Sequence, residues 1–474
     1  MNSSVNSTPT TADPAVGTGL LRFPPDFRWG AATAAFQIEG ATTVDGRGPS
    51  IWDAFAARPG AVLGGDTGEP ACDHYHRYAS DVALMAGLGL RSYRFSLAWP
   101  RIRPTGAGPV EPRGLAFYDR LVDELLGRGI EPVVTLYHWD LPQALEDAGG
   151  WRNRDTAYRF AEYAELAHAR LGDRVAEWTT LNEPWCSAFL GYATGIHAPG
   201  VVDPKGSLEA AHHLLLGHGL ALQAMRARAR PGHRFSIVLN FCAVLAEDEE
   251  AARKVDGLQN RLFLDPLAGR GYPEDVLAET AWLGDWAAVV RPGDLEVIAT
   301  PIDWMGVNYY SPTRVAAAAE SVVADGPFPG LRGVEFLPPR GEVTGFGWEV
   351  RASAFTDLLV RLGRDVAVPL VVTENGSAFP DTVVDGEVED EQRTRYLVDH
   401  LRAVHRAVEA GVDVRGYFAW SLLDNFEWAA GYSQRFGVVH VDYGTQVRTV
   451  KRSGRTLAKV IAANAVPAEG YDLG

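Results

Sequence analysis

Eight short β-type runs alternate with helical stretches along this chain of 474 residues, and no other feature constrains its fold as strongly. The runs are rich in Val, Ile, Thr and aromatic residues, and several have no polar face, which is typical of strands buried on both sides of a parallel sheet. They span Phe27–Ala35, Arg91–Leu97, Glu131–Tyr137, Glu177–Asn182, Arg234–Asn240, Ile302–Tyr309, Pro369–Glu374 and Val412–Trp420. The alternation predicts an α/β fold, a single-domain (β/α)8 TIM barrel.

Helical periodicity between the runs supports this prediction. An apolar stripe from Tyr75 to Met85 follows the spacing of one helix face, and helices are also predicted over Ala157–Leu171 and Leu208–Arg230. The alternative is an open doubly wound sheet, which would need a glycine-rich phosphate loop after an early strand. No G-x-G-x-x-G pattern follows any of the runs, so the closed barrel is favoured.

Two long connections and the start of the chain complete the organisation. Gly40–Ala71 and Ser311–Trp348 have the Gly and Pro content of irregular loops, which we expect over the C-terminal face, where barrel enzymes hold their chemistry. Residues 1–20 are rich in Ser, Thr, Pro and Ala, and we expect a disordered N-terminal tail there. One barrel domain would then occupy residues 21–474.

Charge and cysteine content limit the partners and the compartment. With 44 Lys and Arg against 60 Asp and Glu, the net charge is −16, which repels nucleic-acid phosphates and anionic lipid, so neither nucleic acid nor a membrane is expected as a partner. No apolar run reaches the ~18 residues that a membrane span requires, and the first residues lack the pattern of a secretory signal. The three cysteines form no C-x-x-C pair. We expect a cytoplasmic protein, because cysteine scarcity fits a reducing compartment.

Amides, carboxylates and large aromatic rings gather where the predicted strands end. Seven of the eight ends carry such groups, a mixture that differs from the Lys, Ser and Asp of an ordinary surface loop. The positions are Gln37, Glu39, Arg94, His138, Trp139, Asn182, Glu183, Asn308, Tyr310, Glu374, Asn375, Trp420, Glu427 and Trp428. This set suits an uncharged, polyhydroxylated ring, because amides and carboxylates bind hydroxyl groups and indole faces cover the C–H side of a sugar.

Two glutamates, Glu183 and Glu374, follow the fourth and seventh runs, on roughly opposite sides of a barrel. Side chains that lean over the mouth from these positions can meet. A retaining glycosidase needs two carboxyl groups about 5–5.5 Å apart, one protonated and one ionised. Proximity creates that difference, because the charge on one carboxylate raises the pKa of the other. A helix cap or a rim charge is the alternative for either residue alone, but the pair, each beside an asparagine, favours catalysis.

The segments around these glutamates resemble a known family. Thr180-Leu181-Asn182-Glu183-Pro184 and Thr373-Glu374-Asn375-Gly376 look like the signatures of glycoside hydrolase family 1, the retaining β-glucosidases and their relatives. Four further segments are similar to family motifs in the same order: Phe27 to Gly40, Tyr93 to Ile102, Tyr137 to Pro142 and Trp420 to Trp428. The resemblance covers about Phe23 to Arg452, nearly the whole chain.

The resemblance implies a division of roles. Glu374 would be the nucleophile that forms a covalent glycosyl-enzyme, and Glu183 would be the general acid and base. Arg94 and Tyr310 would orient Glu374 and keep it ionised. Trp420 would lie under the sugar ring, Trp348 would be the platform for the aglycone, and Asn182 would donate to the 2-hydroxyl. The other substrate-binding residues implied are Gln37, His138, Trp139, Asn308, Glu427, Trp428 and Phe436.

Structural roles are the alternatives for several of these residues: a salt bridge for Arg94, core packing for Trp420, a satisfied buried polar group for Gln37 and His138, and a rim charge for Glu427. For Cys186 and His197 a structural role is preferred. No metal site or cofactor is expected, because His74 and His76 lie in a predicted helix where positions i and i+2 face different sides.

The expected activity is hydrolysis of terminal non-reducing β-D-glucosyl residues by a retaining, exo-acting β-glucosidase with β-galactosidase or β-fucosidase side activity. Its partner would be a small β-glycoside or a short β-linked oligosaccharide, as in cellulose degradation. The charge of Glu427 would repel a 6-phosphate, which argues against an enzyme for 6-phosphorylated sugars. Glu183 is a carboxylic acid where thioglucosidases carry an amide, which argues against a thioglucosidase. The alternatives are a transglycosylase on the same site and a non-catalytic sugar-binding barrel, which would lack a carboxylate. The aglycone and the oligomeric state, a homo-oligomer included, stay open.

Overall fold

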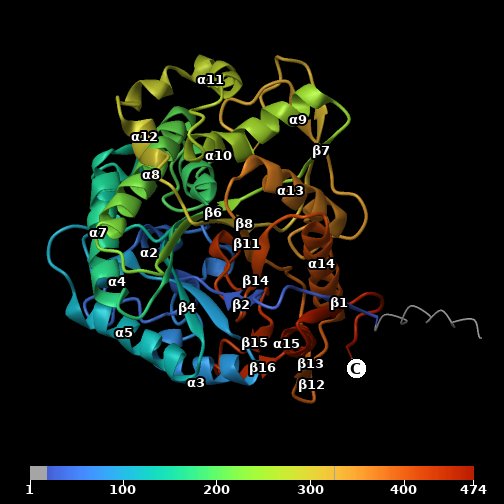
Figure 1. Cartoon of the computed structure of the whole chain (residues 1–474). Helices are drawn as coiled ribbons and strands as arrows, with labels where there is room; N and C mark the ends of the chain where they lie inside the picture. The colour runs from blue at the N-terminus through green and yellow to red at the C-terminus, as the bar shows by residue number, and fades with distance from the viewer. Residues whose placement is uncertain (1–18, 325, 474) are drawn as a thin grey trace, which may run out of the picture.

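The computed structural model, which describes residues 19–324 and 326–473, is built around a closed barrel of parallel strands (Figure 1). The strands follow one another around the barrel in the order β11, β14, β2, β3, β4, β5, β6 and β8. Their bounds are Arg28–Ala32 (β2), Ser92–Ser96 (β3), Glu131–Tyr137 (β4), Glu177–Asn182 (β5), Arg234–Asn240 (β6), Trp304–Asn308 (β8), Leu370–Asn375 (β11) and Val414–Trp420 (β14). The predicted TIM barrel and its eight strands are confirmed, and no strand end differs by more than three residues.

Helices surround the barrel, as Figure 1 shows. The long ones are α3 (His74–Gly87), α5 (Pro112–Gly127), α7 (Asp155–Leu171), α8 (Pro204–Arg226), α13 (Ala352–Asp365), α14 (Glu391–Glu409) and α15 (Arg452–Ala463). Four shorter ones fill the connection between β6 and β8: α9 (Glu249–Asp256), α10 (Leu262–Leu267), α11 (Glu274–Thr280) and α12 (Asp294–Ile298). Short helices also follow the first three barrel strands: α1 (Ala35–Ile38), α2 (Ile51–Ala56), α4 (Trp99–Ile102) and α6 (Gln143–Asp147).

Helix α8 differs from its predicted bounds at both ends. It begins at Pro204 because Asp203 accepts a hydrogen bond from the Gly206 N–H and the proline supplies a helical φ in the first turn. It ends at Arg226, before the Pro231-Gly232 stop that the sequence marks. Helix α7 begins two residues before the predicted Ala157 and ends at Leu171 as expected.

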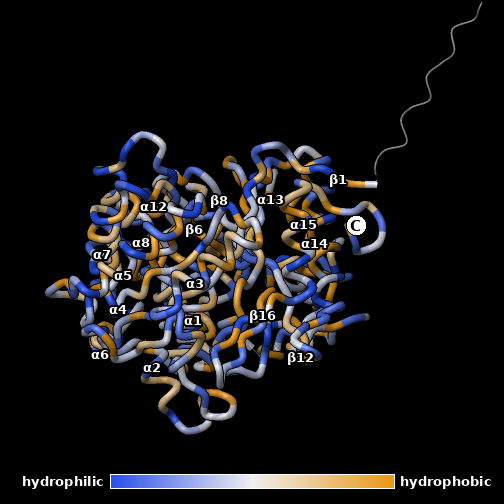
Figure 2. The backbone as a smooth tube through the Cα atoms, turned by 90° about the horizontal axis from the view of Figure 1, so that it is seen from below, coloured by the Kyte–Doolittle hydropathy of each residue, from blue (hydrophilic) through white to orange (hydrophobic). Residues whose placement is uncertain are grey.

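The inside of the barrel is a packed core. Val133, Trp304, Val371 and Phe418 point into it from four strands and are almost fully buried. Gly30 of β2 makes room for this packing, because a Cβ there would lie 2.5 Å from the Phe418 ring. Elsewhere, hydrophobic stretches recur inside the molecule and hydrophilic ones in many peripheral loops (Figure 2). Glu177, at the amino end of β5, is also fully buried and accepts from the Trp304 indole, while most of the candidate site residues lie toward the carboxyl ends of the strands.

The two long connections are partly regular, so the prediction of irregular structure is wrong for these segments. Gly40–Ala71 contains α2, which begins with a reciprocal capping pair between Ser50 and Asp53. Ser311–Trp348 contains β9 (Thr313–Ala317) and β10 (Val334–Phe336), which form a three-stranded sheet with β7 (Val244–Ala246). The glycines and prolines beside β9 and β10 hide the alternation of polar and apolar residues that would mark these strands in the sequence.

The two ends of the described chain pair with each other. Strand β1 (Leu20–Arg22) runs antiparallel to β17 (Ala465–Pro467), and both lie near the C-terminal end in Figure 1. Two further antiparallel pairs are β12 (Val383–Val384) with β13 (Glu387–Val388), and β15 (Val439–Val441) with β16 (Arg448–Val450). Residues 1–18 of the expected tail lie outside the described residues, and Leu20 already belongs to β1. No helix in the described part of the chain has both the length and the apolar character needed to cross a membrane.

Candidate active site

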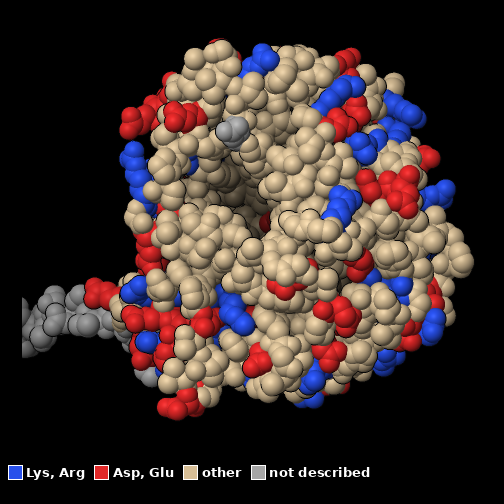
Figure 3. Space-filling view, turned by 180° about the vertical axis from the view of Figure 1, so that it is seen from behind, with Lys and Arg blue, Asp and Glu red and all other residues tan. Residues whose placement is uncertain are grey.

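A cavity of about 520 Å³ lies at the carboxyl ends of the barrel strands. In Figure 3 it is visible as a deep hollow whose rim is mostly uncharged. Eleven of the fourteen residues expected at the site line it: His138, Trp139, Glu183, Asn308, Tyr310, Trp348, Glu374, Trp420, Glu427, Trp428 and Phe436. The other three, Gln37, Arg94 and Asn182, are buried and hydrogen-bond to lining residues. The structure therefore brings the whole predicted set together, and the volume suits a ligand of one or two sugar rings.

Both cavity glutamates stand where a strand departs from regular pairing. Between Thr179 and Asn182, β5 has one residue more than its partner β6, and the N–H of Glu183 then donates to the Val238 carbonyl. Strand β11 likewise has one extra residue before Glu374 relative to β8. Such bulges redirect the following side chain, here into the cavity. Glu183 also has a left-handed backbone with φ 47°, a conformation that costs on the order of 1–3 kcal/mol and is concentrated at functional sites.

A close backbone contact fixes the residue after the second glutamate motif. A Cβ on Gly376 would lie 1.7 Å from the carbonyl oxygen of Trp420. Only glycine allows β11 and β14 to approach so closely at the cavity floor. The close contact with Trp420 therefore explains why glycine ends the segment Thr373-Glu374-Asn375-Gly376.

Two strong donors hold the carboxylate of Glu374. Arg94 donates from Nη1 to Oε1 at 2.6 Å, and the phenol of Tyr310 donates to Oε2 at 2.6 Å. Burial raises the pKa of Glu374, while the Arg94 charge and the Tyr310 hydrogen bond oppose that rise. Each oxygen has its own short, charge-assisted partner, so the carboxylate is oriented and its ionised form is favoured.

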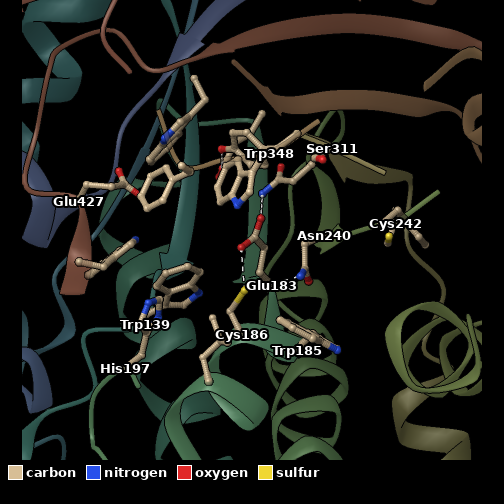
Figure 4. A pocket seen from close by; sticks show the side chains of 18 of the residues that line it. Trp139, Glu183, Trp185, Cys186, His197, Asn240, Cys242, Ser311, Trp348 and Glu427 are labelled. Carbon is tan, nitrogen blue, oxygen red and sulfur yellow. Dashed lines mark hydrogen bonds between the residues drawn. The ribbon is translucent and has the colours of Figure 1, made fainter. Parts of the chain in front are cut away.

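Glu183 has weaker partners. Its Oε1 accepts from Asn308 Nδ2 at 2.7 Å, and its Oε2 lies 3.2 Å from the thiol of Cys186 (Figure 4). Burial, followed by the charge of Glu374, raises the pKa of Glu183 to about 8. At neutral pH the proton that the two carboxyl groups share therefore resides on Glu183, because no cation among residues 19–324 and 326–473 contacts this carboxyl group. One ionised and one protonated carboxyl group in the same cavity can carry out nucleophilic attack and proton donation.

Unused hydrogen-bonding capacity surrounds the two carboxyl groups. Gln37 donates from Nε2 to Glu427 Oε2 at 3.3 Å, but its buried Oε1 has no partner among the described residues. His138 shares a 3.1 Å contact with Asn182 through Nε2, and its buried Nδ1 likewise has no partner in the described ranges. Buried polar atoms without partners are rare in proteins, so these two mark places for ligand hydroxyl groups.

Aromatic rings form the walls of the cavity. Trp420 stacks near His138 with ring centres 5.7 Å apart, and Trp428 packs on Trp139 at 4.6 Å. On the other side, Trp348 stacks on Phe346 at 4.7 Å. Planar faces of this kind cover the C–H surface of sugars and other ring compounds.

The sequence interpretation missed some lining residues. Asn240 ends the fifth predicted strand, the one end that was left without a candidate, and its position alone could have identified it. Trp185 and Phe346 also line the cavity, and no signal in the sequence distinguishes them from core residues. Cys186 and His197, for which the sequence analysis preferred a structural role, line the cavity as well.

The histidines considered as metal ligands lie apart from the cavity and face different surroundings. His74 is buried against Asp81, with 2.8 Å between Nδ1 and Oδ2, and the exposed His76 contacts Asp73 at 2.6 Å. Within residues 19–324 and 326–473, no group of three His, Cys, Asp or Glu side chains is arranged to hold a metal ion.

A (β/α)8 barrel with two differently protonated carboxyl groups in an aromatic-walled cavity defines a glycoside hydrolase. Comparison with known proteins agrees, because the model of glycosyl hydrolase family 1 matches residues 21–466. The chain belongs to glycosyl hydrolase family 1.

Individual relatives are similar over nearly the whole length. The chain is 54% identical over 452 residues to the thermostable beta-glucosidase B of Thermobispora bispora, covering 94% of this chain and 92% of that protein. It is 48% identical to a bifunctional beta-D-glucosidase/beta-D-fucosidase of Bifidobacterium breve, covering 91% and 96%. The crystal structure of a psychrophilic beta-glucosidase from Micrococcus antarcticus superposes with a TM-score of 0.89 at 52% identity, covering 94% of this chain and 98% of that one.

Proposed function

We propose that this chain is a retaining, exo-acting β-glucosidase in which Glu374 is the nucleophile and Glu183 the general acid and base. The observation that carries the proposal is the asymmetry between the two carboxyl groups. Glu374 contacts a guanidinium and a phenol, whereas Glu183 contacts an amide and a thiol. The first environment favours a carboxylate and the second a carboxylic acid.

Each residue then has one task in each step. Glu374 forms a bond to the anomeric carbon while the glycosidic bond breaks, and Glu183 gives its proton to the leaving oxygen. Water next attacks the glycosyl-enzyme, Glu183 takes a proton from it, and the bond to Glu374 breaks. Both carboxyl groups return to their starting states, and the sugar keeps its β configuration.

The glucosyl group is the sugar that the relatives and the polar groups favour. Relatives named as β-glucosidases, one also as a β-fucosidase, are 43–54% identical to this chain. Gln37 and Glu427 lie together beside the cavity and can bind sugar hydroxyl groups. Burial, followed by the charges of Glu374 and Glu183, raises the pKa of Glu427 to about 8, so at pH 7 its repulsion of a phosphate is reduced. Because the described lining contains no Lys or Arg, a 6-phosphorylated sugar would still lack a counter-charge.

The natural substrate in this proposal is a small β-glycoside or a short β-linked oligosaccharide, as in the late steps of cellulose degradation. The cytoplasm is the location we propose with it. The three cysteines, all buried and unpaired, support a reducing compartment.

Product stereochemistry tests the proposal. Proton NMR during hydrolysis of an aryl β-glucoside should show β-glucose first, followed by slow mutarotation. A panel of nitrophenyl β-glycosides should give the highest kcat/KM with the glucoside and measurable rates with the fucoside and galactoside, and the α-glucoside should be inert. Early formation of α-glucose would refute retention. A protein that hydrolyses none of these glycosides would favour the alternative of a non-catalytic sugar-binding barrel.

A further inference from the structure

We propose that Cys186 is a positioning residue for Glu183: its thiol holds Oε2, the one oxygen of Glu183 that carries the catalytic proton. The inference rests on the proposed role of Glu183 as acid and base. It adds which oxygen delivers the proton and what keeps that oxygen in place.

The assignment of the proton begins at Arg94, because a guanidinium can only donate hydrogen bonds. Arg94 Nη2 lies 2.7 Å from Asn182 Oδ1, which fixes this atom as the amide oxygen. The neighbouring atom of Asn308, 3.1 Å from the same oxygen, must then be its NH2 group. The Thr373 hydroxyl, which donates to the Asn308 oxygen at 2.7 Å, agrees with that orientation.

The same Asn308 NH2 group determines the proton position on Glu183. It lies 2.7 Å from Oε1, and an amide N–H cannot accept, so Oε1 must be an acceptor. The unprotonated oxygen of a carboxylic acid is the stronger acceptor, so we place the acidic proton of Glu183 on Oε2. In the described ranges of the chain, the only hydrogen bond to Oε2 comes from Cys186 Sγ at 3.2 Å.

The thiol is suited to this place because it can donate and accept weakly. Sγ can accept from the protonated Oε2 before the first step and donate to the ionised Oε2 before water attacks. A weak partner is easily exchanged for the glycosidic oxygen or for water. Burial raises the pKa of Cys186 well above its usual value, so the group stays a neutral thiol.

The backbone fixes the sulfur relative to the carboxyl group. Cys186 begins the π-helix η3 (Cys186–Ala193), and its N–H donates to the Glu183 carbonyl at 3.0 Å. Asn240 Nδ2, at the carboxyl end of the neighbouring strand β6, lies 3.6 Å from Sγ. Cys186 is 7% exposed and lines the cavity (Figure 4), so its sulfur has little freedom to turn elsewhere.

Kinetics of Cys186→Ala test the inference. With a dinitrophenyl β-glucoside, whose departure needs little acid help, kcat reports the step in which Glu183 acts as base. Loss of one weak hydrogen bond should lower this kcat about 2- to 10-fold. Cys186→Ser, whose hydroxyl can also donate to Oε2, should retain at least half of the wild-type rate. Cys72→Ala is the matched control, because that thiol is also buried and donates to a carbonyl, that of Asp424.

A double-mutant cycle separates this inference from the proposed function. If Cys186 acts through Glu183, adding Cys186→Ala to Glu183→Ala should change nothing further. A second, multiplicative loss in the double variant would overturn the positioning role and leave the Glu183 assignment intact. An unchanged rate in Cys186→Ala would do the same. Failure of the proposed function would appear instead in Glu183→Ala alone, as an equal loss on all leaving groups. Should Cys186→Ala not fold, Cys186→Ser against Cys186→Val makes the same comparison at similar volume.

Discussion

The phenol of Tyr310 donates a 2.6 Å hydrogen bond to Oε2 of Glu374, the oxygen that Arg94 leaves free. Tyr310 follows β8 and Glu374 lies in β11, so the contact joins neighbouring barrel strands at their carboxyl ends. The bond stabilises the ionised form of the carboxylate.

Tyr310→Phe should therefore weaken the nucleophile. Loss of a hydrogen bond to a charged group, about 1.5–3 kcal/mol, predicts a 10- to 100-fold lower kcat/KM. The pKa of Glu374 should rise further, so the acidic limb of the pH profile of kcat/KM should move to higher pH. Tyr309→Phe is the matched control, because its hydroxyl donates to the Arg351 carbonyl at 3.2 Å. An unmoved acidic limb in Tyr310→Phe would contradict the role.

Glu374→Ala should abolish turnover of aryl β-glucosides, because no glycosyl-enzyme can form. A 2-fluoro-glucoside with a good leaving group should label the wild type once, and peptide mass spectrometry should find the label on Glu374. The control replaces Glu274, an exposed residue of α11, by alanine, and this variant should be labelled at the wild-type rate. A label on another residue would remove the nucleophile assignment.

Glu183→Ala should slow substrates with poor leaving groups far more than activated ones, by about 10²–10⁴-fold. The pKa of Glu183 is raised to about 8, so the acid is protonated below that pH. Wild-type kcat/KM should accordingly be maintained below pH 8 and fall as the pH rises through 8. In Glu183→Ala this alkaline limb should disappear; its persistence would assign the titration to another group.

Gly376→Ala should disrupt the cavity floor, because its Cβ would overlap the Trp420 carbonyl oxygen at 1.7 Å and a backbone atom cannot turn aside. Overpacking of this kind costs about 1–3 kcal/mol or more, which calorimetry would detect as a lower Tm. Gly87→Ala at the end of α3 is the control, since a Cβ there has no atom within 4 Å. Equal Tm values for the two variants would refute the steric argument.

Lys451→Met should destabilise the fold, because this fully buried ammonium donates to Asp424 at 2.6 Å and also to Asp381. Arg435 and Arg393 remain beside Asp424 and Asp381, but removing one charge from this buried ion-pair network should cost about 3–5 kcal/mol in denaturant unfolding. The partners lower the pKa of Asp424 against the effect of burial, so its stabilisation is present above its unfolded pKa and is lost as the pH falls. Lys459→Met, which breaks an exposed pair with Asp472, should cost less than about 1 kcal/mol. Equal losses in the two variants would contradict this expectation.

The barrel could be predicted because its strands are buried on both faces. Runs such as Glu131–Tyr137 and Glu177–Asn182 are continuous in burial and match their predicted bounds at both ends. Strands β9 and β10 could not be recognised in the same way, because they are only partly buried and gain their stability from pairing with distant segments.

The site could be predicted to the extent that it consists of strand ends. Parallel strands bring Arg94, Asn182 and Glu374 to one edge of the barrel whatever the loops do. The placement of Cys186 depends instead on the π-helical turn after β5, a backbone detail without a sequence signature. The bulges that turn Glu183 and Glu374 inward are equally invisible, since they arise from pairing with neighbouring strands.

The pairing of β1 with β17 has a practical consequence for engineering. Since Leu20 and Pro467 are opposite each other, a short linker could join the two ends without crossing the barrel. New termini opened in the exposed β12–β13 hairpin would then give a circular permutant. A carrier protein fused directly before Leu20 or after Pro467 would leave from the same corner of the molecule, beside the amino end of β2, on the side of the barrel that faces away from the cavity.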